Sequence, residues 1–291
     1  MRARRYILFL LVVGFLALGL YALLFVSREP RYQGRSLREW VALRGNETGA
    51  IKPSDYEQAI RQMGPSTVPY LVQWVEEPPW RYPLFRKAEP VLAKFRVPVL
   101  GARTYSLAPL SEAFRCLGPD ADTAIAQLSS LLQTSTVRQV AVRAACCLAS
   151  LGDKGAFPLL TGITNQSARF RDECLSQVPH LGSNALPLIP SLVECLKDQD
   201  PWFSAATATI LANLKLRPEI VVPALIQSLR SKDLVLRRSA AVALIGFGSS
   251  ARSAAPALQE ALADPDADLR QDARMALHHI APDYPTNAPS P

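Results

Sequence analysis

A tripeptide of proline, a small residue and leucine recurs in the last third of the chain at a fixed spacing. The copies are Pro190-Ser191-Leu192, Pro223-Ala224-Leu225 and Pro256-Ala257-Leu258, each 33 residues after the last. Each copy is followed by an apolar stretch that begins near Asp200, Asp233 or Asp266, again 33 residues apart. Self-similarity at this period is typical of solenoids, whose repeats cannot bury their apolar faces alone and must stack.

The segments between these landmarks have the composition and periodicity of helices. Apolar residues make up 49% of the chain, and there are only 14 glycines in 291 residues. Several segments end at a glycine, such as Gly152 or Gly248, a residue that can adopt positive φ after a helix. We therefore predict an all-α protein, a right-handed α-solenoid of stacked antiparallel helix pairs over residues 36–280. The proline-rich tail 281–291 is expected to lack regular structure.

Signals for helix starts are present at both ends of this region. Ser36 and Glu39 have the spacing of a capping box, in which a serine and a glutamate three residues later satisfy each other's backbone amides. Asp266, in the acidic run 264–268, precedes an apolar run, and this region is expected to cap the helix that follows. The proline-rich stretch 78–109 interrupts the pattern and is interpreted as an insertion.

The repeated segments resemble HEAT repeats of the short bacterial type. The resemblance is carried by the run from Leu236 to Gly248, which recurs from Leu269 to Leu277 and more loosely from Val142 to Gly152. It covers roughly residues 54–77 and 110–280. It implies an aspartate that caps the second helix of each repeat and an arginine that contacts the neighbouring repeat. Asp233 with Arg237 and Asp266 with Arg270 match these positions, whereas the Asp200 repeat has Ser204 and Lys215 where arginine and glycine are expected.

An uncharged stretch near the N-terminus predicts a membrane anchor. Residues 6–26 form a run of 21 residues without a charge, about 31 Å as a helix, which is enough to cross a hydrocarbon core of about 30 Å. A cleaved secretory signal is the alternative, but its apolar core is shorter and ends at a small-residue site. We predict a basic tail 1–5, a transmembrane helix 6–26 and a polar linker 27–35. The stretch from Tyr32 to Trp40 also resembles the opening of membrane-anchored bacterial HEAT proteins of unassigned role.

The side of the membrane is indicated by opposing signals. Arg2, Arg4 and Arg5 before the span favour a cytoplasmic N-terminus and a soluble domain on the non-cytoplasmic side. Four arginines after the span, and five cysteines without disulfide-type spacing, weaken that orientation. We expect the cysteines to be small core residues.

The insertion carries the candidate partner-binding residues. It combines aromatic and basic side chains close to the predicted anchor: Trp80, Arg81, Arg86, Lys87, Lys94 and Arg96. Such a patch could lie on anionic headgroups or bind an acidic partner. The alternative is a solvated loop that packs on the first repeats through its aromatic residues.

No catalytic, cofactor or metal site is predicted. Only three histidines occur, and the HExxH, GxSxG and GxxxxGK[ST] patterns are missing from the sequence. We therefore expect a membrane-tethered, non-enzymatic scaffold that binds a protein or peptide on its helical-repeat surface. The alternative is a HEAT-like enzyme or ligand-binding module that acts on a tetrapyrrole or nucleic acid through a basic concave groove. Arg237, Arg238, Arg270 and Arg274 would line that groove, although nucleic acid is not expected, because the net charge of +7 is concentrated in the N-terminal tail and the insertion.

Overall fold

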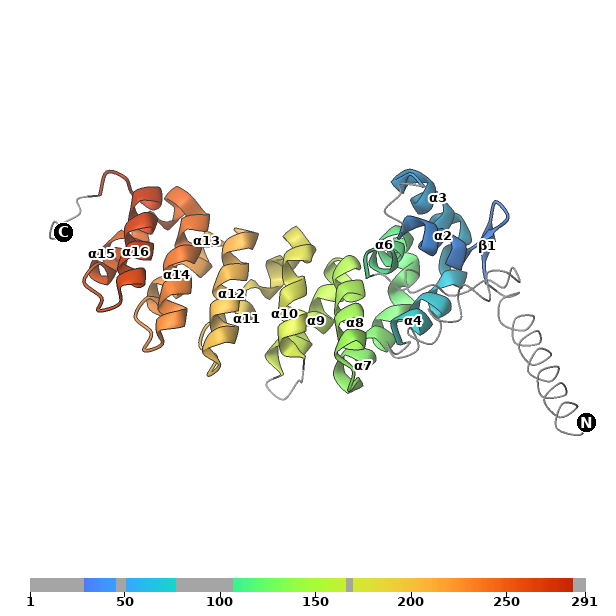
Figure 1. The fold of residues 1–291 in the computed structure, drawn as a ribbon, viewed down its shortest axis with the longest axis horizontal. Coiled ribbons are helices and arrows are strands. Elements are labelled where there is room, and N and C mark those ends of the chain that lie inside the picture. The colour runs from blue at the N-terminus through green and yellow to red at the C-terminus, as the bar shows by residue number, and fades with distance from the viewer. Residues whose placement is uncertain (1–28, 46–50, 77–106, 166–169, 285–291) are drawn as a thin grey trace, which may run out of the picture. The chain divides into compact units, whose positions relative to one another are not determined.

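A computed structural model describes residues 29–45, 51–76, 107–165 and 170–284 (Figure 1). These residues are almost entirely helical, as predicted. The basic tail, the predicted transmembrane helix 6–26 and the tail beyond residue 284 lie outside the described residues, as does most of the proline-rich insertion. Within the described ranges no helix has the length and apolar character needed to cross a membrane.

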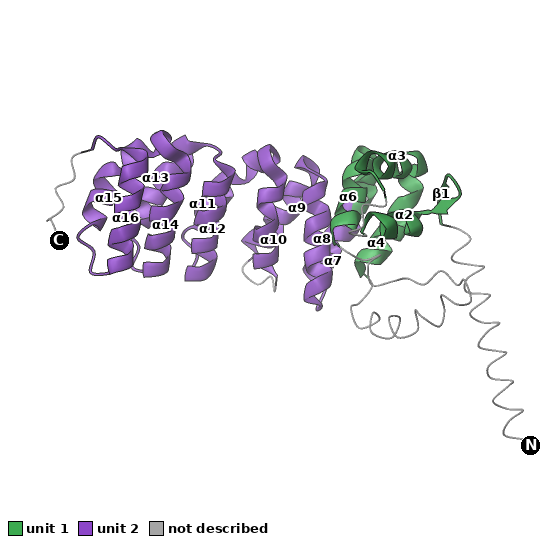
Figure 2. Ribbon diagram, turned by 45° about the horizontal axis from the view of Figure 1, so that its top comes forward, with its two compact units in different colours: residues 1–124 green, residues 125–291 purple. Residues whose placement is uncertain are grey.

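The chain divides into two compact units, residues 1–124 and residues 125–291 (Figure 2). The array predicted over residues 36–280 remains a prediction. The regularly spaced repeat landmarks all lie in unit 2. Unit 1 is built in another way.

Unit 1 begins with a short hairpin in the segment that was predicted to be a linker. Strands β1 (Arg31–Tyr32) and β2 (Arg35–Ser36) pair antiparallel around Gln33 and Gly34, which both have positive φ. The indole Nε1 of Trp40 donates to the carbonyl of Tyr32 over 3.2 Å, so the hairpin is anchored to the first helix. Residues 31–36, most of which were assigned to the polar linker, thus form a hairpin that contacts the first helix.

The described part of unit 1 also contains helices α2 (Leu37–Arg44), α3 (Pro53–Met63), α4 (Val68–Glu76) and α6 (Leu107–Leu117), with 3₁₀ turns at 64–67 and 118–124. The predicted capping box is confirmed at α2. The Oγ of Ser36 accepts from the amide of Glu39, and the Glu39 carboxylate accepts from the amide of Ser36 over 2.6 Å.

The core of unit 1 is rich in aromatic side chains. Tyr56, Trp74 and Phe114 are all buried. The hydroxyl of Tyr56 donates to the carbonyl of Pro109 over 2.8 Å and joins α3 to α6. Burial raises the pKa of this phenol well above its ordinary value. The guanidinium of Arg38 lies 5.6 Å from the centre of the Trp74 ring.

Unit 2 consists of helix pairs in which the second helices stack on one another. The first helices are α7 (Ile125–Thr134), α9 (Asp153–Thr164), α11 (Ile189–Cys195), α13 (Pro218–Ser228) and α15 (Ala255–Ala261). The second helices are α8 (Arg138–Ser150), α10 (Arg171–Gln177), α12 (Pro201–Leu214), α14 (Leu234–Phe247) and α16 (Ala267–Ile280). Helices α12, α14 and α16 contact one another in that order (Figure 1).

The predicted aspartate caps are confirmed. The Oδ1 atoms of Asp200, Asp233 and Asp266 each accept from backbone amides in the first turn of α12, α14 and α16. At the other end, Gly248 has φ 52° and ψ −135°, a conformation that glycine adopts easily. Lys215 takes the same place after α12 in the left-handed region, with φ 54° and ψ 26°. The α12–α13 turn therefore differs from the glycine turn after α14.

Small side chains allow the second helices of unit 2 to approach closely. Ala240, Ala241 and Ala243 of α14 are buried, as are Ala273 and Ala276 of α16. A methyl group built on Gly246 would lie 3.0 Å from the carbonyl oxygen of Ala212 in α12. Leucines such as Leu244 and Leu277 fill the space between the helices. The five cysteines, all in described helices, carry free thiols, and four of them are buried.

Candidate functional site

The residues predicted to bind a partner lie outside the described residues. Trp80, Arg81, Arg86, Lys87, Lys94 and Arg96 all fall within 77–106. They remain a prediction, and so does a role for the insertion. The described residues offer a different candidate, on the second helices of unit 2.

The most exposed tryptophan among the described residues begins this candidate site. Trp202 follows the Asp200 cap in the first turn of α12 and is 74% exposed. The next residue, Phe203, is buried. The cap fixes the direction of the first turn, so the side chain of Phe203 enters the core while that of Trp202 stays in solvent. An exposed residue of this size is unusual, because large aromatic side chains gain most from burial.

Equivalent positions of the neighbouring second helices extend this apolar surface. Thr209, Val242 and Met275 are separated by one repeat period each and occupy the same position of α12, α14 and α16. Val242 is 49% exposed and Met275 40% exposed. Trp202 and Val235 are equivalent in the same way. An apolar side chain therefore occupies the surface position of Val242 in both α14 and α16, where α12 has a threonine.

A pocket of about 400 Å³ lies between these helices. We call the surface around it the second-helix face, and it comprises the pocket residues together with Met275: Trp202, Thr209, Leu234, Val235, Arg238, Ser239, Val242, Asp272 and Met275. Exposed apolar side chains next to charged groups are characteristic of binding surfaces between proteins.

The charged part of the second-helix face is organised around one arginine. The guanidinium of Arg238 in α14 donates through Nε to Asp272 over 2.9 Å and through Nη1 to Asp268 over 2.8 Å, both in α16. Asp272 is buried, whereas Asp268 is exposed. The hydrogen bond to Asp272 raises the pKa of Arg238 further above its ordinary value. The two ion pairs of Arg238 join α14 to α16 and place charged groups beside the apolar side chains.

The arginines expected in a basic groove are engaged in other contacts. Arg237 and Arg270 donate through Nη1 to backbone carbonyls of the loops that precede their own helices, at residues 231, 232, 264 and 265. Arg237 also pairs with Asp264 of the next repeat, at 3.3 Å, as the HEAT resemblance implies. Arg274 bonds to Gln271. Together with the ion pairs of Arg238, these contacts place three of the four arginines in the framework of the repeats.

The histidines do not form a metal centre in the described part of the chain. The rings of His278 and His279 are nearly perpendicular, with ring centres 5.8 Å apart, and the Nδ1 of His279 lies 2.8 Å from the carbonyl of Met275. Among the described residues no group of three or more histidine, cysteine or carboxylate side chains has the geometry to hold a metal ion.

Sequence reasoning missed Trp202, Val242 and Met275. An apolar residue in a helix is assigned to the core by default, and which side of each helix is exposed depends on how the helices stack. Comparison of positions one repeat period apart was the available signal, because it aligns Thr209 with Val242 and Met275.

Comparisons with known proteins agree with the repeats of unit 2. The family model for HEAT repeats matches residues 189–278. No curated protein matches the chain.

Solved structures of repeat proteins are similar to the chain at low identity. A designed armadillo repeat protein in complex with the peptide (KR)4 is 16% identical, with a TM-score of 0.43, over 73% of this chain and 98% of that one. Kap121p is 14% identical, with a TM-score of 0.47, over 84% of this chain and 27% of that one. Human deoxyhypusine hydroxylase in complex with glycerol is 17% identical, with a TM-score of 0.37, over 83% of each chain. Residues 189–278, which contain the whole second-helix face, are thus similar to HEAT repeats.

Proposed function

We propose that the protein is a membrane-tethered, non-enzymatic scaffold that binds a protein or peptide partner through the second-helix face. The observation that carries this proposal is the exposure of Trp202 in one pocket with Val242, together with the exposed Met275 at the equivalent position of the next second helix. Tryptophan is enriched among the residues that dominate binding energy in protein interfaces. Stacked repeats also offer an extended surface of the kind that binds partners in solenoid proteins.

The proposal includes an anchor formed by residues 6–26 and a soluble domain on the non-cytoplasmic side. It is supported by the 21-residue uncharged run and by Arg2, Arg4 and Arg5 before it. A C-terminal fusion to alkaline phosphatase, which is active only outside the cytoplasm, tests the orientation. Activity is expected with this reporter and not with a cytoplasmic reporter at the same position. Extraction of the full chain from membranes by alkaline carbonate would contradict the anchor.

Site-specific photocrosslinking tests the second-helix face. A photoreactive phenylalanine analogue at position 242 is expected to crosslink the full-length chain to a partner in cells. Trp202→Ala should abolish that crosslink, because an interface tryptophan commonly contributes about 2 kcal/mol or more. The matched control is Phe157→Ala in α9, which removes an aromatic side chain of similar exposure, 72%, from a first helix of the same unit.

Two outcomes would contradict the proposal. One is a crosslink at position 242 that Trp202→Ala leaves unchanged. The other is a crosslink at position 157 to the same partner with equal yield, which would indicate nonspecific attachment to exposed aromatic residues.

A further inference from the structure

Consecutive repeats of unit 2 are joined by a recurring ion pair. Arg171 in α10 donates to Asp198 over 2.6 Å, and its guanidinium carbon lies 3.6 Å from the centre of the Phe203 ring. Arg237 in α14 forms an ion pair with the equivalent Asp264, with 3.3 Å between Nε and the carboxylate. The acceptor follows the arginine at the same sequence separation in both cases, and the two arginines lie two repeat periods apart. Each arginine thus connects its helix to the following repeat.

The repeat between them lacks both partners of this ion pair. Ser204 occupies the arginine position, midway in sequence between Arg171 and Arg237, and Ser231 occupies the acceptor position, midway between Asp198 and Asp264. The Ser204 side chain is 1% exposed, and its hydroxyl donates to the carbonyl of Pro201 over 3.1 Å. Since the arginine and the acid are replaced together, neither is left as an unpaired charge.

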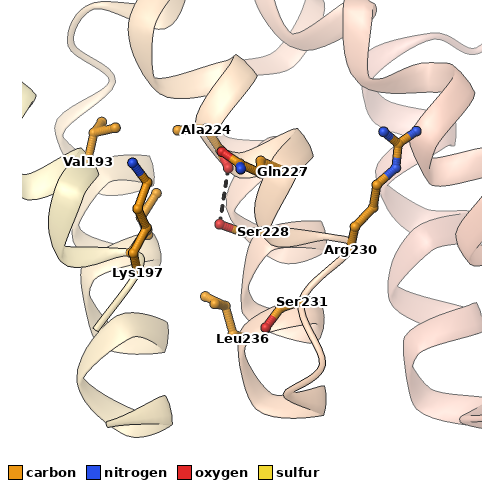
Figure 3. Close-up of a pocket in the computed structure, with 9 residues that line it drawn as sticks. Val193, Lys197, Ala224, Gln227, Ser228, Arg230, Ser231 and Leu236 are labelled. Atoms are coloured by element: carbon orange, nitrogen blue, oxygen red, sulfur yellow. Dashed lines mark hydrogen bonds between the residues drawn. The ribbon is translucent and has the colours of Figure 1, made fainter. Parts of the chain in front are cut away.

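The substitution coincides with a larger groove. At the junction with the ion pair, a groove of about 310 Å³ is lined by Arg171, Glu194, Lys197 and Asp198, among others. At the next junction the equivalent groove has about 540 Å³. We call it the open groove (Figure 3). Its residues at the equivalent positions are Gln227 for Glu194, Arg230 for Lys197 and Ser231 for Asp198.

The two grooves differ in charge as well as in volume. Among the described residues that line the smaller groove, two cations face two carboxylates. The described lining of the open groove holds the cations Lys197 and Arg230 and no carboxylate. The formal charge of the lining residues therefore changes from zero to +2 from one repeat to the next, and the carboxylates that pair with the two cations, Glu194 and Glu260, lie outside the lining of the open groove. Such a groove attracts an anionic group.

The open groove also presents neutral hydrogen-bond donors. Figure 3 shows Lys197 on one side, Gln227 and Ser228 on the other, and Ser231 with Leu236 below them. The Oγ of Ser231 accepts from the amide of Asp233 over 3.1 Å, which leaves its own hydrogen for another acceptor. The side-chain amide of Gln227 supplies two further donors. Leu196 and Leu236 give the groove an apolar floor.

The cations of the open groove can exchange their present partners for a ligand. Lys197 pairs with Glu194 one helical turn away, at 2.8 Å, and Arg230 extends toward Glu260, at 3.1 Å. All four side chains are exposed. Exposed pairs of this kind contribute little to stability, so a bound carboxylate can replace Glu194 at Lys197 without a large cost.

We propose that the open groove binds an acidic side chain, aspartate or glutamate, from an extended segment of a protein partner. The carboxylate would accept from Lys197, Ser231 and Gln227, and the adjoining methylene groups would contact Leu236. This inference deepens the proposed scaffold role and rests on it, because it names the chemistry of one part of the partner. It uses residues separate from the second-helix face, so the two sites can be tested separately.

Fluorescence anisotropy with labelled octapeptides tests the open groove. The full-length chain in a mild detergent is titrated with a peptide of alternating glutamate and glycine, and with the same peptide carrying glutamine. Only the glutamate peptide is expected to bind, and added salt should weaken its binding. Lys197→Gln and Ser231→Asp should each weaken binding about tenfold or more, the loss expected for one charge-assisted hydrogen bond.

A repaired junction provides the sharpest variant. Ser204→Arg combined with Ser231→Asp restores the ion pair seen on both sides and should abolish binding of the glutamate peptide. If an arginine does not fit at the buried position 204, Ser231→Asp alone still tests whether a carboxylate in the groove prevents binding. Phe157→Ala is the control and should leave peptide binding unchanged.

Several outcomes would overturn the inference. They are equal binding of the glutamine peptide, equal binding to the repaired chain, no binding of the glutamate peptide, and binding of a single-stranded oligonucleotide in its place. Loss of the position 242 crosslink in Trp202→Ala, with peptide binding absent, would leave the scaffold proposal standing and reject only the open groove.

Discussion

Unit 1 builds its core from aromatic side chains, whereas the second helices of unit 2 pack through alanines. In unit 1, Tyr56, Trp74 and Phe114 come from three different helices and have no counterparts at a fixed spacing. In unit 2, alanines recur at equivalent positions of α14 and α16, so each helix meets its neighbour in the same way. A large side chain fills one particular space, but a small one makes a contact that can be repeated. Repetition therefore requires small residues at the helix contacts.

The largest expected effect is the removal of an aromatic side chain from unit 1. Trp74→Ala should lower the free energy of unfolding of this unit by about 3–5 kcal/mol, because Trp74 is 1% exposed and its loss leaves a cavity. Hydrogen exchange, resolved by peptide in the full chain, measures the change in each unit. The exposed Trp202→Ala in unit 2 is the matched control and should change stability little. Equal loss of protection in both units would show that they unfold together and would contradict the view that each unit is stabilised by its own core.

A smaller effect is expected when a repeated alanine of unit 2 is enlarged. Ala241→Leu should destabilise unit 2 by about 1–3 kcal/mol, because Ala241 is fully buried in the stack and extra methylene groups force the helices apart. The adjacent Val242→Leu changes an exposed position and serves as the control. Chemical denaturation monitored by circular dichroism measures both. An unchanged midpoint for Ala241→Leu would show that small side chains are not needed there.

A helix cap should have an effect of about 1 kcal/mol. Asp233→Ala removes an acceptor whose Oδ1 lies 2.8 Å from the amide of Val235 and 3.2 Å from that of Leu236. Asp233→Asn keeps a side-chain acceptor and should retain most of the stability that Asp233→Ala loses. Hydrogen exchange at the first turn of α14 reports the change directly. Equal destabilisation by both variants would assign the effect to the charge and not to the cap.

The smallest predicted effect is a pH dependence in unit 1. Glu29 is buried beside Arg38, 2.7 Å away, and burial raises the pKa of its carboxyl despite the arginine. The folded state then binds the proton more tightly than the unfolded state, so the contribution of Glu29 to stability falls as the pH rises from about 4.5 through the raised pKa. Glu29→Gln should remove this fall, as measured by denaturation between pH 4 and pH 7. The exposed Glu57→Gln should retain it.

The second helices of unit 2 were predictable because local and long-range signals agree there. Asp233 caps the helix over residues 234–247, and its position follows from the repeat spacing. The hairpin at Arg31–Ser36 was not predictable, because two-residue strands have no alternation and their order depends on the indole of Trp40. The second-helix face was also missed. Exposure of Trp202 depends on the stacking of helices, which no local pattern contains.

The sequence indicated only one of the two substitutions that create the open groove. Ser204 stood out as a departure from the HEAT pattern, but its meaning depended on Ser231 and on the contact between Arg171 and Asp198. Arg171 and Asp198 belong to different repeats, so their pairing emerges only once the helices are stacked. Gly182, Lys215 and Gly248 share the register of the repeats and would have extended the alignment back to Arg171.

The contact of Tyr56 with Pro109 has a practical consequence for the insertion. Helices α4 and α6, which flank residues 77–106, pack in the same core. The segments on either side of residues 77–106 thus belong to one core, and the entropic cost of joining two such segments depends only weakly on the length of the connection. Residues 78–105 can therefore be excised and bridged by a short glycine-serine graft while the hydrogen bond to Pro109 persists. Partner binding by that truncated chain would show what the helical body does alone, and the difference from the full chain would show what the aromatic and basic residues of the insertion contribute.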